Sequence, residues 1–163
     1  METIAKRGSI TNGPSGTEIR IERVFAHPPA AVWSYLTESS SLAQWLAPGT
    51  IEPRIGGAAR LDFADSGIVI DSEVTEFIPQ KAVAYSWSSR SEPKRPLLFA
   101  LESIPSGTRL RLCLTIPKDE DGPRAAAGFE AHLEMLAAAL EGVPIRFPFA
   151  LFKELRTFYQ APD

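Results

Sequence analysis

The chain has 163 residues, which suits one domain, and its 44% hydrophobic and 23% charged residues are typical of a globular protein with its own core. The formal net charge of −3 argues against the basic surface that non-specific binding of nucleic acid or of an anionic membrane requires. The sequence has one cysteine, no secretory signal and no apolar run of about 20 residues, so we expect a cytoplasmic protein without a membrane partner.

The first elements are a leader and a strand. Residues 1–16 are small, polar and rich in glycine, and we expect them to form a flexible leader. From Thr17 to Phe25, apolar and charged residues alternate, which predicts a strand with one buried face. Arg23 shares the parity of the buried face, which leaves two readings open: a salt bridge at the surface or rim, or an inward position. An inward guanidinium needs an anion, which is either a ligand group or a carboxylate. Asp71 and Glu73 are candidates, although their parity opposes the apolar face of their own strand.

Two short helices and a series of strands follow. Pro29 opens a short helix that ends near Leu36, and a second helix carries Leu42, Trp45 and Leu46 on its apolar side. Between Ile51 and Pro117, short alternating runs are separated by turn residues. Consecutive strands with short connections form an antiparallel meander, so we expect a curved sheet of six to seven strands.

The last regular element predicted is a long helix from about Pro123 to Glu141. On a helical wheel with ~100° per residue, Leu133, Leu136 and Leu140 fall within about 40° of Phe129. This apolar stripe needs a cover, and the predicted sheet has one open face. The sequence therefore predicts an α+β fold in which the sheet wraps around this helix.

Residues 143–163 form a tail with unusual aromatic content. It contains Phe147, Phe149, Phe152, Phe158 and Tyr159. So much aromatic surface seldom stays in water, so we expect the tail to cover its own domain or a neighbouring subunit, as in a homodimer.

Five segments together resemble a known superfamily. They are RVFAHPPAAVWSYLTESSSLAQWLAP, IGGAARLDF, GIVIDSEVTEFIPQKAVAYSW, GTRLRLCLTIP and AAGFEAHLEMLAAALEG, in this order. They are similar to the START-like (SRPBCC) superfamily with its helix-grip fold, and most similar to the branch named after the C-terminal domain of the heat-shock-protein ATPase activator. The resemblance covers about residues 17–142. The tryptophan that usually opens the last helix is Phe129 here.

This resemblance implies a cavity between the long helix and the sheet. The residues expected to line it are mostly aromatic, as is common for sites that hold flat or apolar molecules: Trp45, Phe63, Tyr85, Trp87, Phe99, Phe129, His132, Leu133 and Leu136. We therefore predict a small hydrophobic or aromatic ligand and no cofactor. The same side chains could equally form an ordinary core.

His132 is the most informative polar residue. It lies at the border of the apolar stripe, where it could bond a ligand, act as a general acid or base, or bond a carbonyl of the sheet. His27 and His132 are too far apart in the sequence to suggest a metal site.

Two alternatives to ligand binding remain open at this stage. The resembling proteins include co-chaperones and stress-response proteins, so a protein-interaction domain is the first. The second is a cyclase- or hydrolase-type enzyme that uses His132, which we favour less because one acid or base alone defines no reaction.

Overall fold

The computed structural model describes residues 8–63 and 66–160. It contains one eight-stranded antiparallel sheet and four helices in this part of the chain. The strands are β1 (Gly8–Gly13), β2 (Gly16–Phe25), β3 (Gly49–Ile51), β4 (Ala58–Phe63), β5 (Ile68–Ile78), β6 (Ala82–Ser86), β7 (Pro96–Ile104) and β8 (Gly107–Ile116). The helices are α1 (Pro29–Thr37), α2 (Ser39–Trp45), α3 (Gly122–Leu140) and α4 (Phe149–Gln160).

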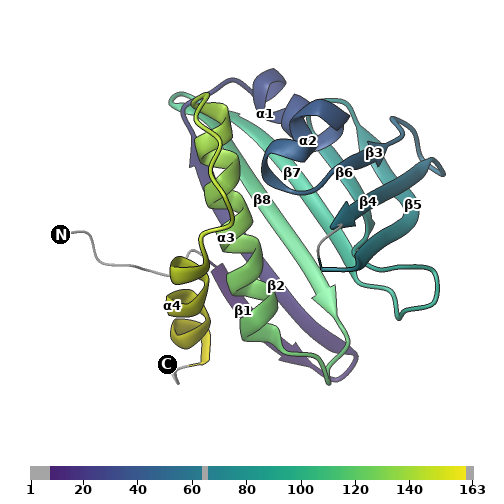
Figure 1. The fold of residues 1–163 in the computed structure, drawn as a ribbon. Helices are drawn as coiled ribbons and strands as arrows, with labels where there is room; N and C mark the ends of the chain where they lie inside the picture. The colour runs from purple at the N-terminus through teal and green to yellow at the C-terminus, as the bar shows by residue number, and fades with distance from the viewer. Residues whose placement is uncertain (1–7, 64–65, 161–163) are drawn as a thin grey trace.

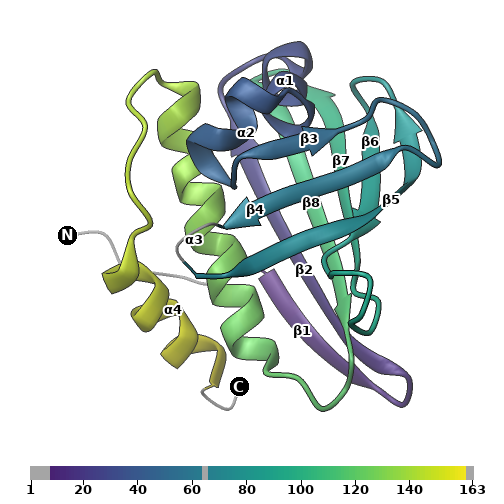
Figure 2. The same ribbon diagram turned by 45° about the vertical axis from the view of Figure 1, so that its right-hand side comes forward.

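The strands follow the order β1-β2-β8-β7-β6-β5-β4-β3. The chain therefore leaves the sheet after β2, forms α1 and α2, and returns at the far edge with β3. Figures 1 and 2 show that the sheet curves strongly and that α3 lies across its concave side. This arrangement confirms the predicted α+β helix-grip fold.

Burial along α3 follows the predicted stripe. Phe129, Leu133 and Leu136 are buried, and Leu140 packs against the core at the end of the helix. Each fully buried leucine contributes about 1.5–3 kcal/mol relative to exposure. Asp121 caps the helix, because its carboxylate accepts a hydrogen bond from the Arg124 backbone N–H at 3.0 Å.

Strand β8 supplies the opposite surface of this core. Leu110, Leu112, Leu114 and Ile116 are at most 3% exposed, while the alternate residues point to the outer face. The central β2–β8 pair is thus the floor beneath α3, as the period-two pattern predicted.

The predicted strand count and the predicted leader are wrong in one respect. Residues 8–13 form β1, which pairs with β2 along its length at the edge of the sheet, so residues 1–16 are not a flexible leader throughout. Four of the six residues of β1 are exposed, which explains why no apolar alternation marked the strand. Residues 1–7 of that expectation lie outside the described residues.

The aromatic tail folds onto its own domain. After Gly142, whose φ of 79° suits a helix end, the linker of residues 143–148 runs back along α3 and leads into α4 (Figures 1 and 2). Helix α4 packs against α3 and buries Leu155 and Tyr159. Phe149 stays 67% exposed.

Candidate functional site

A continuous row of rings connects the sheet, α3 and the linker. Tyr85 at the end of β6 contacts Trp87, which contacts Phe63 of β4 at 5.8 Å and Phe129 of α3 at 5.1 Å between ring centroids. Both phenylalanines contact His132, and His132 contacts Phe147 at 5.2 Å. We call these six residues the aromatic row: Tyr85, Trp87, Phe63, Phe129, His132 and Phe147.

Exposure changes along the aromatic row. Tyr85 at one end is 1% exposed and Phe129 is 4% exposed. Trp87, Phe63, His132 and Phe147 are only partly buried. The row therefore joins four partly exposed rings to two rings that are buried between α3 and the sheet.

His132 is fixed by one hydrogen bond. Its Nδ1 lies 2.9 Å from the backbone oxygen of Trp45, at the end of α2. Because a carbonyl oxygen only accepts, Nδ1 carries the proton. Burial lowers the pKa of the His132 imidazole, and the bond to Trp45 opposes this shift. The ring is therefore neutral at pH 7, with Nε2 as an acceptor.

This bond matches one of the three sequence-based interpretations of His132 and leaves the other two as predictions. The matching one is a border histidine bonded to a backbone carbonyl, although the carbonyl belongs to α2 rather than to a strand. The bond to Trp45 is the hydrogen bond that His132 makes among the described residues, so Nε2 stays available to a ligand or to solvent.

The other predicted cavity residues surround the row. Trp45 is fully buried, packs edge-on against Phe99 at 6.0 Å, and donates its indole N–H to the Tyr35 carbonyl. Leu133 and Leu136 are fully buried on the sheet side of α3. The structure thus brings all nine predicted residues into or against one core cluster.

Two surface pockets of about 350 Å³ each lie away from α3. One lies over β1, β2 and β8 and includes Cys113, and burial raises the pKa of that thiol. The other lies beside β5 and β6 and includes Tyr85 together with polar residues of the loop that precedes β7. The cavity expected under α3 therefore stays a prediction.

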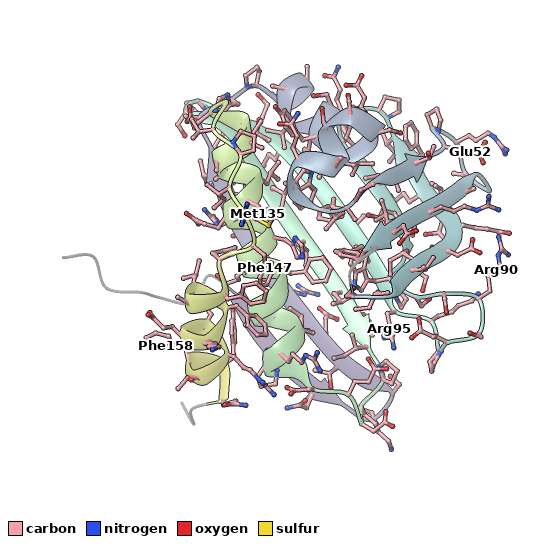
Figure 3. All side chains as sticks on the ribbon, viewed as in Figure 1. Glu52, Arg90, Arg95, Met135, Phe147 and Phe158 are labelled. Carbon is pink, nitrogen blue, oxygen red and sulfur yellow. The ribbon has the colours of Figure 1, made fainter. Side chains whose placement is uncertain are left out.

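Phe147 is the member of the row that the sequence analysis did not assign to the site. Figure 3 shows it beside α3, where the linker enters α4. It also contacts Phe149 and Phe152. The density of aromatic residues in the tail was the available signal, but no periodicity indicated which ring would face His132.

Of the two positions left open for Arg23, the structure shows the inward one, with a partner other than Asp71 or Glu73. It is 8% exposed, and its guanidinium donates to the carboxylate of Glu134 on α3 at 3.1 Å. Asp71 instead pairs with Arg60 and Arg90. Strand parity could not show that α3 would place a carboxylate over β2.

A sequence profile identifies the family. The profile of the activator of Hsp90 ATPase homolog 1-like proteins matches residues 26–141, which is more than half of the chain. The chain belongs to this family. No curated protein sequence matches it.

Solved structures share the fold of this family member. CalU16 from Micromonospora echinospora is 19% identical with a TM-score of 0.77, over 94% of this chain and 93% of that one. The protein EF2215 from Enterococcus faecalis, of unknown function, is 19% identical with a TM-score of 0.76, over 94% and 88%. The protein encoded by BPP1335 of Bordetella parapertussis is 23% identical with a TM-score of 0.73, over 98% and 93%. At these identities the likeness establishes the fold alone.

Within residues 8–63 and 66–160 of this family member, no group of three or more metal-binding side chains comes together. In the same ranges, no helix combines the length and the apolar character needed to cross a membrane.

Proposed function

We propose that this protein binds a small hydrophobic or aromatic molecule among the rings of the aromatic row, between α3 and the sheet. The observation that carries this proposal is that the row joins partly exposed rings such as Phe147 to two buried ones, Phe129 at 4% and Tyr85 at 1%. These connected rings offer a flat molecule an apolar surface that reaches the interior, where each ring presents a face or an edge.

Two rings of the row lie outside the helices and strands. Trp87 follows the last residue of β6, and Phe147 lies in the linker, so neither belongs to a helix or strand. Both are partly buried. A ligand can therefore displace the contacts that each of them makes with its neighbouring rings without breaking the hydrogen-bond ladder of a strand.

The surroundings of His132 favour binding over catalysis. Its contacts among the described residues are the rings of Phe63, Phe129 and Phe147 and the Trp45 carbonyl. None of these can take a proton from it or give one to it. A hydrolase or cyclase would need a second acid or base near the reacting atoms.

Native mass spectrometry of the protein purified from its own cells tests the proposal first, since a bound molecule would add a defined mass. Calorimetric titration with tetralin, a small aromatic hydrocarbon, then tests the location. Trp87→Leu should weaken tetralin binding about three- to tenfold, the value expected for one lost aromatic contact.

Trp33→Leu is the matched control. Trp33 is a partly buried tryptophan of α1 that packs on Phe77, outside the aromatic row. The Trp33→Leu variant should bind tetralin with the same affinity as the wild type. Equal losses in both variants, or no tetralin binding to the wild type, would contradict the proposed site.

A further inference from the structure

Tyr85 carries a buried polar atom that the fold does not use. The side chain is 1% exposed, and its hydroxyl has no hydrogen-bond partner among the described residues. A hydroxyl removed from water without a partner costs free energy, so native proteins rarely keep one without a reason. An unused donor of this kind marks a place where a ligand group can bond.

The hydroxyl belongs to the concave side of the sheet. The residues paired with Tyr85 on the neighbouring strands are Val74 and Leu97, and both are buried in the core at 1% exposure. Side chains paired across strands share a face, so Tyr85 points toward the interior that α3 covers. Burial raises the pKa of Tyr85, which keeps the phenol protonated and able to donate.

Tyr85 lies at the inner end of the aromatic row. Its ring centroid is 6.5 Å from that of Trp87, which in turn contacts Phe129 and Phe63. At the opposite end, His132 uses Nδ1 to bond Trp45. The row thus has a hydrogen-bond donor at its buried end and, at Nε2 of His132, an acceptor near its surface end.

We infer that Tyr85 determines the specificity of this site by donating a hydrogen bond to an oxygen atom of the ligand, so that the ligand class is an oxygenated aromatic molecule such as an aryl ketone. The inference rests on the proposed function and adds the chemical group that is recognised. The hydrocarbon part of the ligand lies against Trp87 and Phe129, and its oxygen reaches the Tyr85 hydroxyl.

Two probes separate this inference from simple hydrophobic binding. In 1-tetralone the only polar atom is a carbonyl oxygen, which accepts from Tyr85 but cannot donate to Nε2 of His132. Tetralin has the same ring system without that oxygen. The change in the ratio of the two affinities between wild type and a Tyr85 variant, measured by calorimetry on the full chain, therefore reports the hydrogen bond, because the different hydration of the two probes cancels.

Tyr85→Phe removes the hydroxyl and keeps the ring. It should weaken 1-tetralone binding about five- to tenfold, the value of one hydrogen bond, while tetralin affinity stays the same or rises. Tyr35→Phe is the matched control, because the Tyr35 hydroxyl bonds the Ala139 carbonyl outside the row. This control should leave the affinities of both probes unchanged.

The outcomes of this experiment separate the role of Tyr85 from the proposed function. If the wild type binds both probes and Tyr85→Phe leaves their affinity ratio unchanged, the role of Tyr85 is wrong while the proposed function stands. If the wild type binds neither probe, the proposed function fails and the inference fails with it.

The stability of the free protein gives an independent check that the Tyr85 hydroxyl has no hydrogen-bond partner. Tyr35→Phe loses a hydrogen bond and should lower the denaturant midpoint, whereas Tyr85→Phe should leave the midpoint unchanged or raise it. A larger loss in Tyr85→Phe than in Tyr35→Phe would show that the free protein already uses the hydroxyl, and would overturn the inference.

Discussion

His132 of α3 and Trp45 of α2 are joined by a hydrogen bond of 2.9 Å between Nδ1 and the backbone oxygen. This bond links the long helix to the end of the short one that precedes β3. It also sets the tautomer of the ring, and so leaves Nε2 as an acceptor toward the entrance of the aromatic row.

His132→Ala should alter ligand binding without preventing folding. The variant leaves the Trp45 carbonyl without its donor, so we expect a loss of about 1–2 kcal/mol in the free energy of unfolding. His132→Asn keeps a donor near the Nδ1 position and should lose less than half of this. Urea unfolding measures both values, and tetralin titration should show weaker binding in both, since each loses the ring. Unfolded His132→Ala protein would contradict this prediction.

The pH dependence of stability should carry a contribution from His132. Burial lowers its pKa in the folded state below the ordinary value of 6.5, which the residue regains on unfolding. As the pH falls below about 6.5, the unfolded chain takes up a proton that the folded chain does not, so the free energy of unfolding decreases. His132→Asn removes this contribution. The difference in the free energy of unfolding between wild type and His132→Asn should thus change between about pH 7 and pH 5. Curves of this free energy against pH that run parallel for the two proteins would rule the prediction out.

The Arg23–Glu134 pair should stabilise the contact between β2 and α3. Arg23 is buried at 8% exposure, whereas the Glu134 side chain is 43% exposed, so water can partly replace the lost carboxylate. Glu134→Gln should therefore cost about 1–2 kcal/mol, between the values for exposed and buried pairs. Glu22→Gln is the control, since the Glu22–Arg111 pair is exposed on both sides. Equal effects of the two changes in urea unfolding would show that burial of Arg23 does not matter.

Helix α4 should detach when its buried anchor is shortened. Leu155 is 3% exposed, and a leucine-to-alanine change at such a site costs about 2–5 kcal/mol. We expect Leu155→Ala to speed amide hydrogen exchange in residues 149–160 while β8 stays protected. Lys153→Ala, at an exposed position of the same helix, should exchange like the wild type. Loss of protection in β8 as well would mean that α4 is part of the main folding unit.

The sequence predicted those parts of the fold whose burial is periodic. Leu110, Leu112 and Leu114 alternate along β8, and Phe129 and Leu133 share one side of α3, so one-dimensional patterns were enough. Strand β1 escaped prediction because an exposed edge strand needs no apolar alternation. Backbone hydrogen bonds to β2 hold it, and these leave no mark on side-chain periodicity.

Five of the six residues of the aromatic row were predicted from the sequence to lie together, whereas Phe147 and the contacts between the rings were not. The resemblance to a superfamily pointed to Tyr85, Trp87 and Phe129, and the structure arranges them in one row. The contact between Phe147 and His132 depends on the path of the linker after Gly142. That path is set by tertiary packing rather than by local preference. For the same reason, parity on β2 showed that Arg23 faces inward but could not name Glu134 as its partner.

The most direct test of the central claim uses the three tryptophans of the chain as reporters. In a ¹H–¹⁵N correlation spectrum each indole N–H gives its own signal, and titration with tetralin shows which one moves. If tetralin binds at the aromatic row, the Trp87 signal should shift strongly while the Trp33 signal stays unchanged. A shift confined to Trp33, or no shift at saturating tetralin, would contradict it.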